Sequence, residues 1–287
     1  MSLFLYPSRN GVKVYDHKME NFTGEISNPR IQMRLDKEAE SMMKEGNLSK
    51  LNIYVSMPTF VKTHYKILMG GVKGTPYEGG LIKINMYVPN TYPAMPPLCH
   101  FASGLGDKRL HPNYYVDGKI CLSLLGTWGN TWSAATKMEI ILCAIQERMC
   151  EHPLTCEPGY EEAPKTRKFE NDTYNNLVMY EVIRVTVVEQ FMHWNKYDLK
   201  KLVEKDPDTV KKVKGSEVEY EMDIIPKAIE LFKSSYDSGV YHKKISALEE
   251  LGLEGKVLTC LWFSSKLQLE SLRTDLENVK KIVDALS

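Results

Sequence analysis

The strongest constraint on how this chain folds is a proline-rich segment at residues 88–97. Its sequence, VPNTYPAMPP, holds four prolines in ten residues. Proline has no backbone N–H to donate to a sheet, so it cannot lie in a central strand. The chain must therefore leave any sheet after the alternating run Leu81–Val88, and it can rejoin the sheet only at Leu98–Phe101.

Other strand-like and helix-like runs surround this segment. Apolar or alternating stretches at 51–57, 64–69, 81–88 and 98–101 predict an antiparallel meander of four strands. Before them, Ser27-Asn28-Pro29 is typical of a helix start, and this helix is expected to continue to about Lys44. After them, a periodic apolar stripe predicts a helix at 134–150.

The segment Leu110–Ala134 carries the candidate chemistry. Asn113 stands eight residues before Cys121, and Asp117-Gly118 between them is a tight-turn signal. A turn there brings the Asn113 amide back toward the sulfur of Cys121. A thiol suits acyl transfer because it is both a nucleophile and a leaving group, and an amide N–H can stabilise an oxyanion.

These residues resemble the active-site segment of ubiquitin-conjugating enzymes, which has the same order of His111-Pro112-Asn113, then 117–122, then 132–135. Residues 75–101, TPYEGGLIKINMYVPNTYPAMPPLCHF, are similar to the sheet region of that family. The resemblance implies that Cys121 carries ubiquitin as a thioester. It also implies that Asn113 steadies the charge that develops during transfer.

The resemblance further assigns supporting residues. His111 and Pro112 are expected to hold the loop that contains Asn113, and Trp132 is interpreted as a packing residue, as is Trp128. His152 stands at the gate position, where small members of the family commonly have an Asp or Ser that lines the approach to the thioester.

Three basic residues on the first helix, Arg30, Arg34 and Lys37, are expected to fall on a different face from its apolar stripe. In the resembled family, basic residues of this helix dock the activating enzyme. Complementary charge of this kind mainly raises the encounter rate. A solvated helix face explains the same residues equally well.

The chain departs from small members of the family after the cysteine. Its loop 126–131 is longer and adds Trp128. The sequences LLGTW at 124–128 and EPGYE at 157–161 resemble the large or hybrid subfamily, which includes apollon-type proteins and proteins that combine conjugating and ligase activity.

Other chemistries fit the same residues less well. His111 could act as a base for Cys121 in a cysteine hydrolase, although the resembled family uses that histidine to hold the loop. A zinc site lacks the usual Cys-x-x-Cys pair among the nearest candidates, which are Cys143, Cys150, His152 and Cys156. We therefore expect no metal and no cofactor.

The second half of the chain changes character at about residue 165. Helices are expected at 172–194 with Asp172 as the cap, at 226–236, at 241–251 and at 257–286. The last has a heptad seam too short for a coiled coil, so it is expected to pack on the catalytic domain or on the 172–194 helix.

Composition limits the partners and the compartment. Lys plus Arg equals Asp plus Glu at 37 each, so the charge balance gives no sign of nucleic-acid binding. No apolar run approaches the ~20 residues that a membrane span needs, and no signal peptide is recognised. Six cysteines among apolar segments favour free thiols, and hence the cytosol or nucleus.

The sequence therefore predicts an α+β fold with three parts: an N-terminal arm at 1–26, a ubiquitin-conjugating catalytic domain at 27–164, and an α-helical C-terminal extension at 165–287. The resemblance implies the partners, which are ubiquitin, a ubiquitin-activating enzyme, a ubiquitin ligase and substrate proteins that accept ubiquitin on lysine. Two alternatives stay open. One is conjugation of another ubiquitin-like modifier, and the other is an inactive scaffold that binds ubiquitin or a ligase.

Overall fold

The computed structural model describes residues 26, 28–57, 63–103, 108–127, 131–214 and 216–286. The chain divides into two compact units. The first unit holds 1–69, 82–107 and 113–148, and the second holds 70–81, 108–112 and 149–287. The expected N-terminal arm, apart from residue 26, lies outside the described residues. Within the described part of the chain, no helix has the length and apolar character to cross a membrane.

In the first unit, helix α1 (Pro29–Met43) begins where the sequence predicts. The Asn28 side chain accepts a hydrogen bond from the Arg30 N–H at 3.0 Å, and a proline occupies the first helical position. Leu35, Ala39 and Met42 form the buried stripe. The helix ends at Met43, and the backbone of the next residue, Lys44, is extended.

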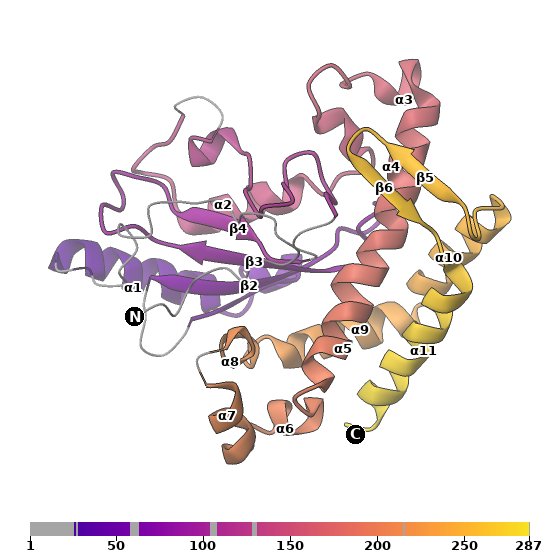
Figure 1. Cartoon of the computed structure of the whole chain (residues 1–287). Coiled ribbons are helices and arrows are strands. Elements are labelled where there is room, and N and C mark those ends of the chain that lie inside the picture. The colour runs from indigo at the N-terminus through magenta and orange to yellow at the C-terminus, as the bar shows by residue number, and fades with distance from the viewer. Residues whose placement is uncertain are drawn as a thin grey trace. The chain divides into compact units, whose positions relative to one another are not determined.

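The strands of the first unit's sheet follow one another in sequence order, β1-β2-β3-β4 (Figure 1). Their bounds are Ile53–Ser56, His64–Gly70, Leu81–Tyr87 and Leu98–Phe101. β1 pairs antiparallel with β2, and β3 pairs antiparallel with β4. The predicted meander is confirmed.

The proline-rich segment leaves the sheet between β3 and β4, as predicted. It makes two turns, in which the Tyr92 N–H donates to the Pro89 carbonyl at 2.9 Å and the Ala94 N–H donates to the Thr91 carbonyl at 2.8 Å. Tyr92 is fully buried, so the segment contributes to the core although it lies outside the sheet.

Helix α2 (Met138–Glu147) begins four residues later than the sequence indicates. Residues 133–136 form a turn, in which the Thr136 N–H donates to the Ser133 carbonyl at 2.9 Å. The expected start at Ala134 was wrong, because a carboxylate distant in sequence determines where α2 begins. The Met138 N–H donates to Glu38 Oε2 at 2.9 Å, so a side chain of α1 caps α2.

The second unit contains one long helical rod, visible in Figure 1, that combines α4 (Lys168–Glu181), a π-helical segment (Val182–Glu189) and α5 (Gln190–Asn195). The β-branched run at 182–188 is helical, as predicted. The expectation that Asp172 caps this helix was wrong. The short helix α3 (Ala163–Thr166) ends just before Arg167, and Arg167 is the N-cap residue of α4. Asp172 instead pairs with Lys168 one turn earlier in α4.

The remaining helices of the second unit are shorter. The charged region 195–223 holds three of them, and the helices expected at 226–236 and 241–251 are confirmed as α9 and α10. Their bounds are α6 (Leu199–Val203), α7 (Pro207–Val213), α8 (Glu217–Glu221), α9 (Ile225–Asp237), α10 (Val240–Glu250) and α11 (Leu269–Asp284). As expected, α11 packs on the long rod.

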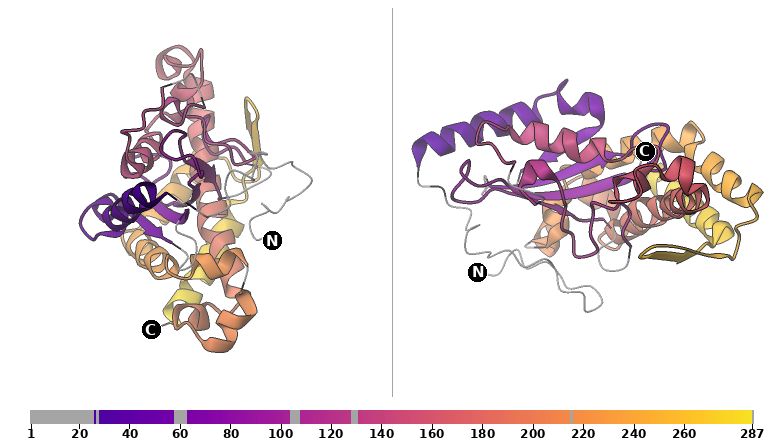
Figure 2. Two further views of the ribbon diagram at one scale, coloured as in Figure 1. Left: turned by 90° about the vertical axis from the view of Figure 1, so that its left-hand side faces the viewer. Right: turned by 90° about the horizontal axis from the view of Figure 1, so that it is seen from above.

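A β-hairpin replaces the first part of the helix expected at 257–286. Strands β5 (Val257–Cys260) and β6 (Phe263–Lys266) pair antiparallel and lie against α4 (Figures 1 and 2). Leu261 adopts φ +52°, the left-handed backbone that a two-residue hairpin turn requires. Helix α11 starts only at Leu269, whose N–H donates to Glu254 Oε2 at 2.6 Å.

The glycine-rich loop 71–80 belongs to the second unit, where α10 holds it. Lys244 Nζ donates to the Pro76 carbonyl at 2.7 Å and to the Glu78 carbonyl at 2.6 Å. The Tyr241 hydroxyl donates to the Gly79 carbonyl at 2.9 Å. The expected catalytic domain 27–164 is thus divided between the units, because 70–81, 108–112 and the residues after 148 cluster with the extension.

We expect the stability contributed by Lys244 to rise with pH. Burial lowers the pKa of Lys244 from 10.5 to about 7. Between these values the unfolded chain binds a proton at this site that the folded chain does not bind, so the free energy of unfolding increases as the pH increases. Below pH ~7 both states are protonated and the contribution is constant.

The measurement is urea denaturation of the wild type and of Lys244→Met at several pH values between ~6 and ~10. The methionine variant keeps the long side chain and all other titrating groups, so the difference between the two proteins isolates Lys244. A difference that stays constant from neutral to alkaline pH would contradict the neutral, buried amine.

Candidate functional site

Asn113 and Cys121 face each other across a short hairpin in the first unit. The Cys121 N–H donates to the Asn113 carbonyl at 2.9 Å, and Asn113 Nδ2 donates to the Cys121 carbonyl at 2.9 Å. Tyr114 and Ile120 form the next bridge of the hairpin. The predicted turn therefore does bring the amide to the cysteine, and a pair of hydrogen bonds holds it there.

The turn of this hairpin depends on Asp117 and Gly118. The Gly118 N–H donates to the Tyr115 carbonyl at 2.9 Å, and Asp117 Oδ1 accepts from the Lys119 N–H at 3.0 Å. Gly118 has φ +90°, and a Cβ there would lie 1.9 Å from Nε2 of the buried His100. Only glycine satisfies both the backbone angle and this close approach.

The hairpin is fastened to the core of the first unit at two points. The Phe101 N–H, at the end of β4, donates to the Gly118 carbonyl at 2.8 Å. The buried Tyr114 stacks on Phe101 with ring centroids 5.2 Å apart and donates its hydroxyl to the Ile145 carbonyl at 2.6 Å. The positions of Asn113 and Cys121 are thus set by β4 and α2.

The Cys121 sulfur lies beneath the loop that follows it. Cys121 is 5% exposed, and its Sγ–H contacts the Thr127 carbonyl at 3.8 Å. The Thr127 hydroxyl fastens this loop, since it accepts from the Leu122 N–H at 2.7 Å and donates to the Leu122 carbonyl at 2.9 Å. The Cys121 sulfur and the loop residue Thr127 are thus in contact.

Thr127 is a residue that sequence reasoning missed. The resemblance covers the residues before Cys121 and from Trp132 onward, whereas the loop between them is where this chain departs from small members of the family. The Thr127 side chain makes the hydrogen bonds to Leu122, so no helix, strand or turn pattern in the sequence predicts them. Trp128 in the same loop lies outside the described residues.

Trp132 connects the loop after the cysteine to the proline-rich segment. Its Nε1–H donates to the Pro93 carbonyl at 2.9 Å, and its ring lies 6.4 Å from that of Tyr92. Trp132 is half-buried. These contacts are those of a packing residue, which is the role that the sequence predicts.

Arg34 is bound within its own unit. Its Nε donates to Glu38 Oε1 at 2.6 Å, and its Nη1 donates to the Ala134 carbonyl at 2.6 Å. Its Nη2 donates to the Thr136 carbonyl and to the Tyr92 hydroxyl, both at 3.1 Å. The guanidinium thus ties α1 to the turn before α2 and to the proline-rich segment.

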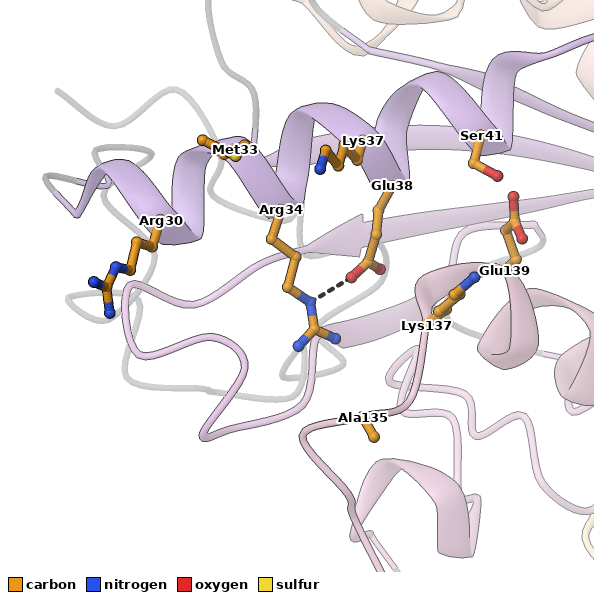
Figure 3. A pocket seen from close by; sticks show the side chains of 9 residues that line it. All are labelled: Arg30, Met33, Arg34, Lys37, Glu38, Ser41, Ala135, Lys137 and Glu139. Atoms are coloured by element: carbon orange, nitrogen blue, oxygen red, sulfur yellow. Dashed lines mark hydrogen bonds and ion pairs between the residues drawn. The ribbon is translucent and has the colours of Figure 1, made fainter.

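A cavity of about 440 Å³ lies beside these contacts (Figure 3). Arg30 and Lys37 border it from exposed positions of α1, while Arg34 points toward Glu38 and forms its wall. Of the three predicted docking residues, Arg30 and Lys37 therefore present their charge at the surface. Arg34 is already committed to internal acceptors. The docking role itself stays a prediction.

His111 and Pro112 belong to the second unit, and the structure buries the histidine completely. The Tyr77 hydroxyl donates to the Leu110 carbonyl at 2.7 Å, and the Tyr77 ring lies 6.1 Å from that of His111. A buried imidazole packed on a tyrosine fits a residue that holds a loop. It fits poorly with a base that exchanges protons with water during hydrolysis.

His152 lies in the second unit just after Glu151, with 38% of its side chain exposed. The Asn171 side chain, which is buried, places Nδ2 at 3.3 Å from His152 Nδ1. An amide nitrogen can only donate, so Nδ1 accepts and the neutral ring carries its proton on Nε2. Nε2 lies 3.9 Å from Glu151 Oε1, and its N–H is therefore the group available for hydrogen bonding.

The described residues contain no group of three or more His, Cys, Asp or Glu side chains placed to hold a metal ion.

Sequence reasoning overlooked Asn171, which lies nineteen positions after His152, the histidine that it contacts. The start of α4 at Lys168 brings it there, and that start was itself mispredicted.

The sequence model of a family described as ubiquitin-conjugating enzyme matches residues 34–182, just over half of the chain. The chain is 34% identical over 171 residues to ubiquitin-conjugating enzyme E2 Z of Homo sapiens, across 59% of this chain and 47% of that protein. It is 31% identical over 189 residues to probable ubiquitin-conjugating enzyme protein 17 of Caenorhabditis elegans, across 62% of this chain and 26% of that protein. The chain thus spans about half the length of the first relative.

Among solved structures, the E2 domain of a Toxoplasma gondii ubiquitin-conjugating enzyme aligns with a TM-score of 0.43 and 25% identity, covering 55% of this chain and 99% of that chain.

Replacing Gly118 by alanine should destabilise the first unit by ~2–4 kcal/mol, since the left-handed backbone costs ~1 kcal/mol and displacing the His100 ring costs a further 1–3 kcal/mol. Gly126→Ala is the matched control, because Gly126 also has positive φ but a Cβ there meets nothing within 4 Å. Chemical denaturation of both variants measures the difference. Equal destabilisation would show that contact with His100 does not constrain the turn.

Proposed function

The chain belongs to the ubiquitin-conjugating enzyme family, and we propose that it accepts ubiquitin from an activating enzyme as a thioester on Cys121 and passes it to a substrate lysine. The observation that carries this proposal is the pairing of Asn113 with Cys121 across the hairpin. It brings a nucleophile and a hydrogen-bond donor together, as acyl transfer requires.

Two acyl transfers make up the reaction. In loading, the Cys121 thiolate attacks the thioester carbonyl held by the activating enzyme, a new C–S bond forms, and the activating enzyme's thiolate leaves. In discharge, the neutral lysine amine attacks the Cys121 thioester, the C–N bond forms, the C–S bond breaks, and the amine loses a proton. Sulfur serves as nucleophile in the first step and leaving group in the second.

Asn113 acts on the oxyanion of the discharge step. Its Nδ2 now donates to the Cys121 carbonyl, so a side-chain rotation redirects an amide that already lies beside the reacting residue. Loss of such a donor costs ~3–4 kcal/mol in other enzymes. The same rotation breaks the hydrogen bond from Asn113 Nδ2 to the Cys121 carbonyl, so this bond holds the amide in place until the reaction begins.

Loading requires access to the sulfur. Because the Thr127 carbonyl covers Cys121, loop 122–127 opens when the thioester forms. The hydrogen bonds that close the loop are local and include those of the Thr127 hydroxyl to Leu122, so a narrow, extended chain terminus can displace them. His152, with 38% of its side chain exposed, remains the residue that we propose for the gate position on the sequence resemblance.

We place the protein in the large or hybrid subfamily. The long loop 126–131, His152 at the gate position and the extension support this, and so do relatives far longer than the matched region, since the match covers 26% of the C. elegans protein. Its proposed partners are ubiquitin, an activating enzyme, a ligase and substrate proteins. We also propose the cytosol or nucleus as its compartment, because its six cysteines lie among apolar segments.

Cys121→Ala should abolish adduct formation, whereas Asn113→Ala should load normally and discharge to lysine roughly 100- to 1,000-fold more slowly, because only the transfer oxyanion uses the amide. The assay is a reducing-agent-sensitive adduct formed with activating enzyme and ATP, followed by single-turnover discharge to free lysine. Cys143→Ala and Asn195→Ala are the matched controls, and Asn195 is exposed.

Equal loss of loading in the Cys121 and Asn113 variants would contradict the role of Asn113. Running the assay with a panel of modifiers separates the alternatives. An adduct with a different ubiquitin-like protein names that modifier, no adduct at all favours a scaffold, and unaided cleavage of a ubiquitin ester indicates a hydrolase.

Arg30→Glu combined with Lys37→Glu should slow loading at low salt, and the deficit should shrink as salt increases, because exposed charges act mainly on encounter and are screened. Lys211→Glu combined with Lys212→Glu is the control, since both lysines are exposed on α7. Loading rates unchanged at every salt concentration would favour a solvated helix face. Arg34 is left intact because it holds α1 to the turn before α2.

A further inference from the structure

We propose that Arg109 and Trp262 are positioning residues for the transfer step, because together they fix the peptide that leads into Asn113. The proposal rests on the function proposed above. It assigns the β5–β6 hairpin of the extension a part in the reaction. The argument runs through the segment 108–112, which belongs to the second unit and is joined covalently to Asn113 at residue 112.

The segment begins under the hairpin. Lys108 Nζ donates to the Ser264 carbonyl of β6 at 3.0 Å and lies 3.9 Å from Glu181 Oε1 at the end of α4. The Glu181 side chain is fully buried, so this carboxylate keeps its partners in a medium of low dielectric. The first residue of the segment is therefore tied to both β6 and α4.

Arg109 is the central anchor. Its guanidinium lies 3.8 Å from the centre of the Trp262 ring, at the turn of the hairpin, and its carbonyl accepts from the buried Tyr174 hydroxyl at 3.3 Å. Burial raises the pKa of Tyr174, so the hydroxyl stays protonated and donates. Arg109 Nη2 also donates to the Pro112 carbonyl.

The last of these hydrogen bonds reaches the catalytic asparagine through peptide geometry. The Pro112 carbonyl and the Asn113 N–H belong to one planar peptide group, so a donor that orients the carbonyl also orients the N–H and the Cα of Asn113. Proline adds its own fixed φ just before this plane. Trp262 holds the guanidinium, the guanidinium holds the Pro112 carbonyl, and this carbonyl sets the plane of the peptide that enters Asn113.

Trp262 is too exposed to be a core residue, so its effect on Arg109 can be tested without unfolding the protein. Trp262 is 38% exposed, and its neighbour Leu261 is 39% exposed, so the turn of the hairpin is not part of a core. A partly exposed cation–π contact is worth ~0.5–1 kcal/mol. Truncating this ring should leave the fold intact while it loosens Arg109.

The experiment compares Trp262→Ala with Trp262→Phe and with Phe169→Ala, a control that removes an aromatic ring that is 80% exposed. We expect Trp262→Ala to load ubiquitin like the wild type and to discharge to free lysine ~2–5-fold more slowly, the fold-change that corresponds to the lost contact. Trp262→Phe keeps an aromatic face and should recover most of the rate. Phe169→Ala should discharge normally.

Two further measurements distinguish positioning from damage. In an Asn113→Ala background, Trp262→Ala should slow discharge no further, because its effect passes through that amide. The backbone amide resonance of Asn113 should shift in Trp262→Ala and stay unchanged in Phe169→Ala, whether or not the protein conjugates ubiquitin.

Several results would overturn the proposal. These are normal discharge by Trp262→Ala, an additive loss in the Asn113→Ala background, loss of loading equal to loss of discharge, or an unmoved Asn113 resonance. A wild type that forms no adduct would refute the proposed function instead, and the Asn113 resonance would still decide whether Trp262 positions that residue.

Discussion

The reciprocal hydrogen bonds between Asn113 and Cys121 are the interaction on which the rest of the site depends. They place an amide donor beside the residue that would carry the acyl group, and each of the two hydrogen bonds is 2.9 Å long. The turn at Gly118 closes the hairpin between them, and Tyr114 and Phe101 fasten it to α2 and β4. Backbone pairing of the hairpin and the side-chain contacts of Tyr114 therefore both hold Asn113 beside Cys121.

Carboxylates distant in sequence decide where two helices begin. Glu38 on α1 accepts the Met138 N–H and starts α2, while it also binds Arg34 and the Tyr92 hydroxyl. Glu254 accepts the Leu269 N–H and starts α11. An exposed helix start would be capped by a residue next to it, but a packed start can take its acceptor from any element that the fold brings near. Arg34 is held in the same network, so of the three basic residues predicted to dock a partner only Arg30 and Lys37 lie at exposed positions.

Local patterns were sufficient for the four strands, α1, α9 and α10, because each has its own caps, turns or alternation. They failed at the starts of α2 and α4 and at the β5–β6 hairpin. The run after Val257 contains β-branched residues, but a helical stripe further on obscured the turn at Leu261. At the site, the motif named Asn113, Cys121 and Trp132. It could not name Thr127, Asn171 or Trp262, whose contacts join segments without a shared pattern.

The sequence by itself determined the chemistry and its order along the chain: a thiol, an amide eight residues before it, and a turn that makes them meet. Those relations span few residues, and local backbone geometry is enough to fix them. Only the tertiary structure decided how the segment entering Asn113 is held, that the thiol lies beneath Thr127, and that Arg34 faces inward. Each of these depends on which distant groups burial brings within hydrogen-bonding range, and no short-range pattern encodes that proximity.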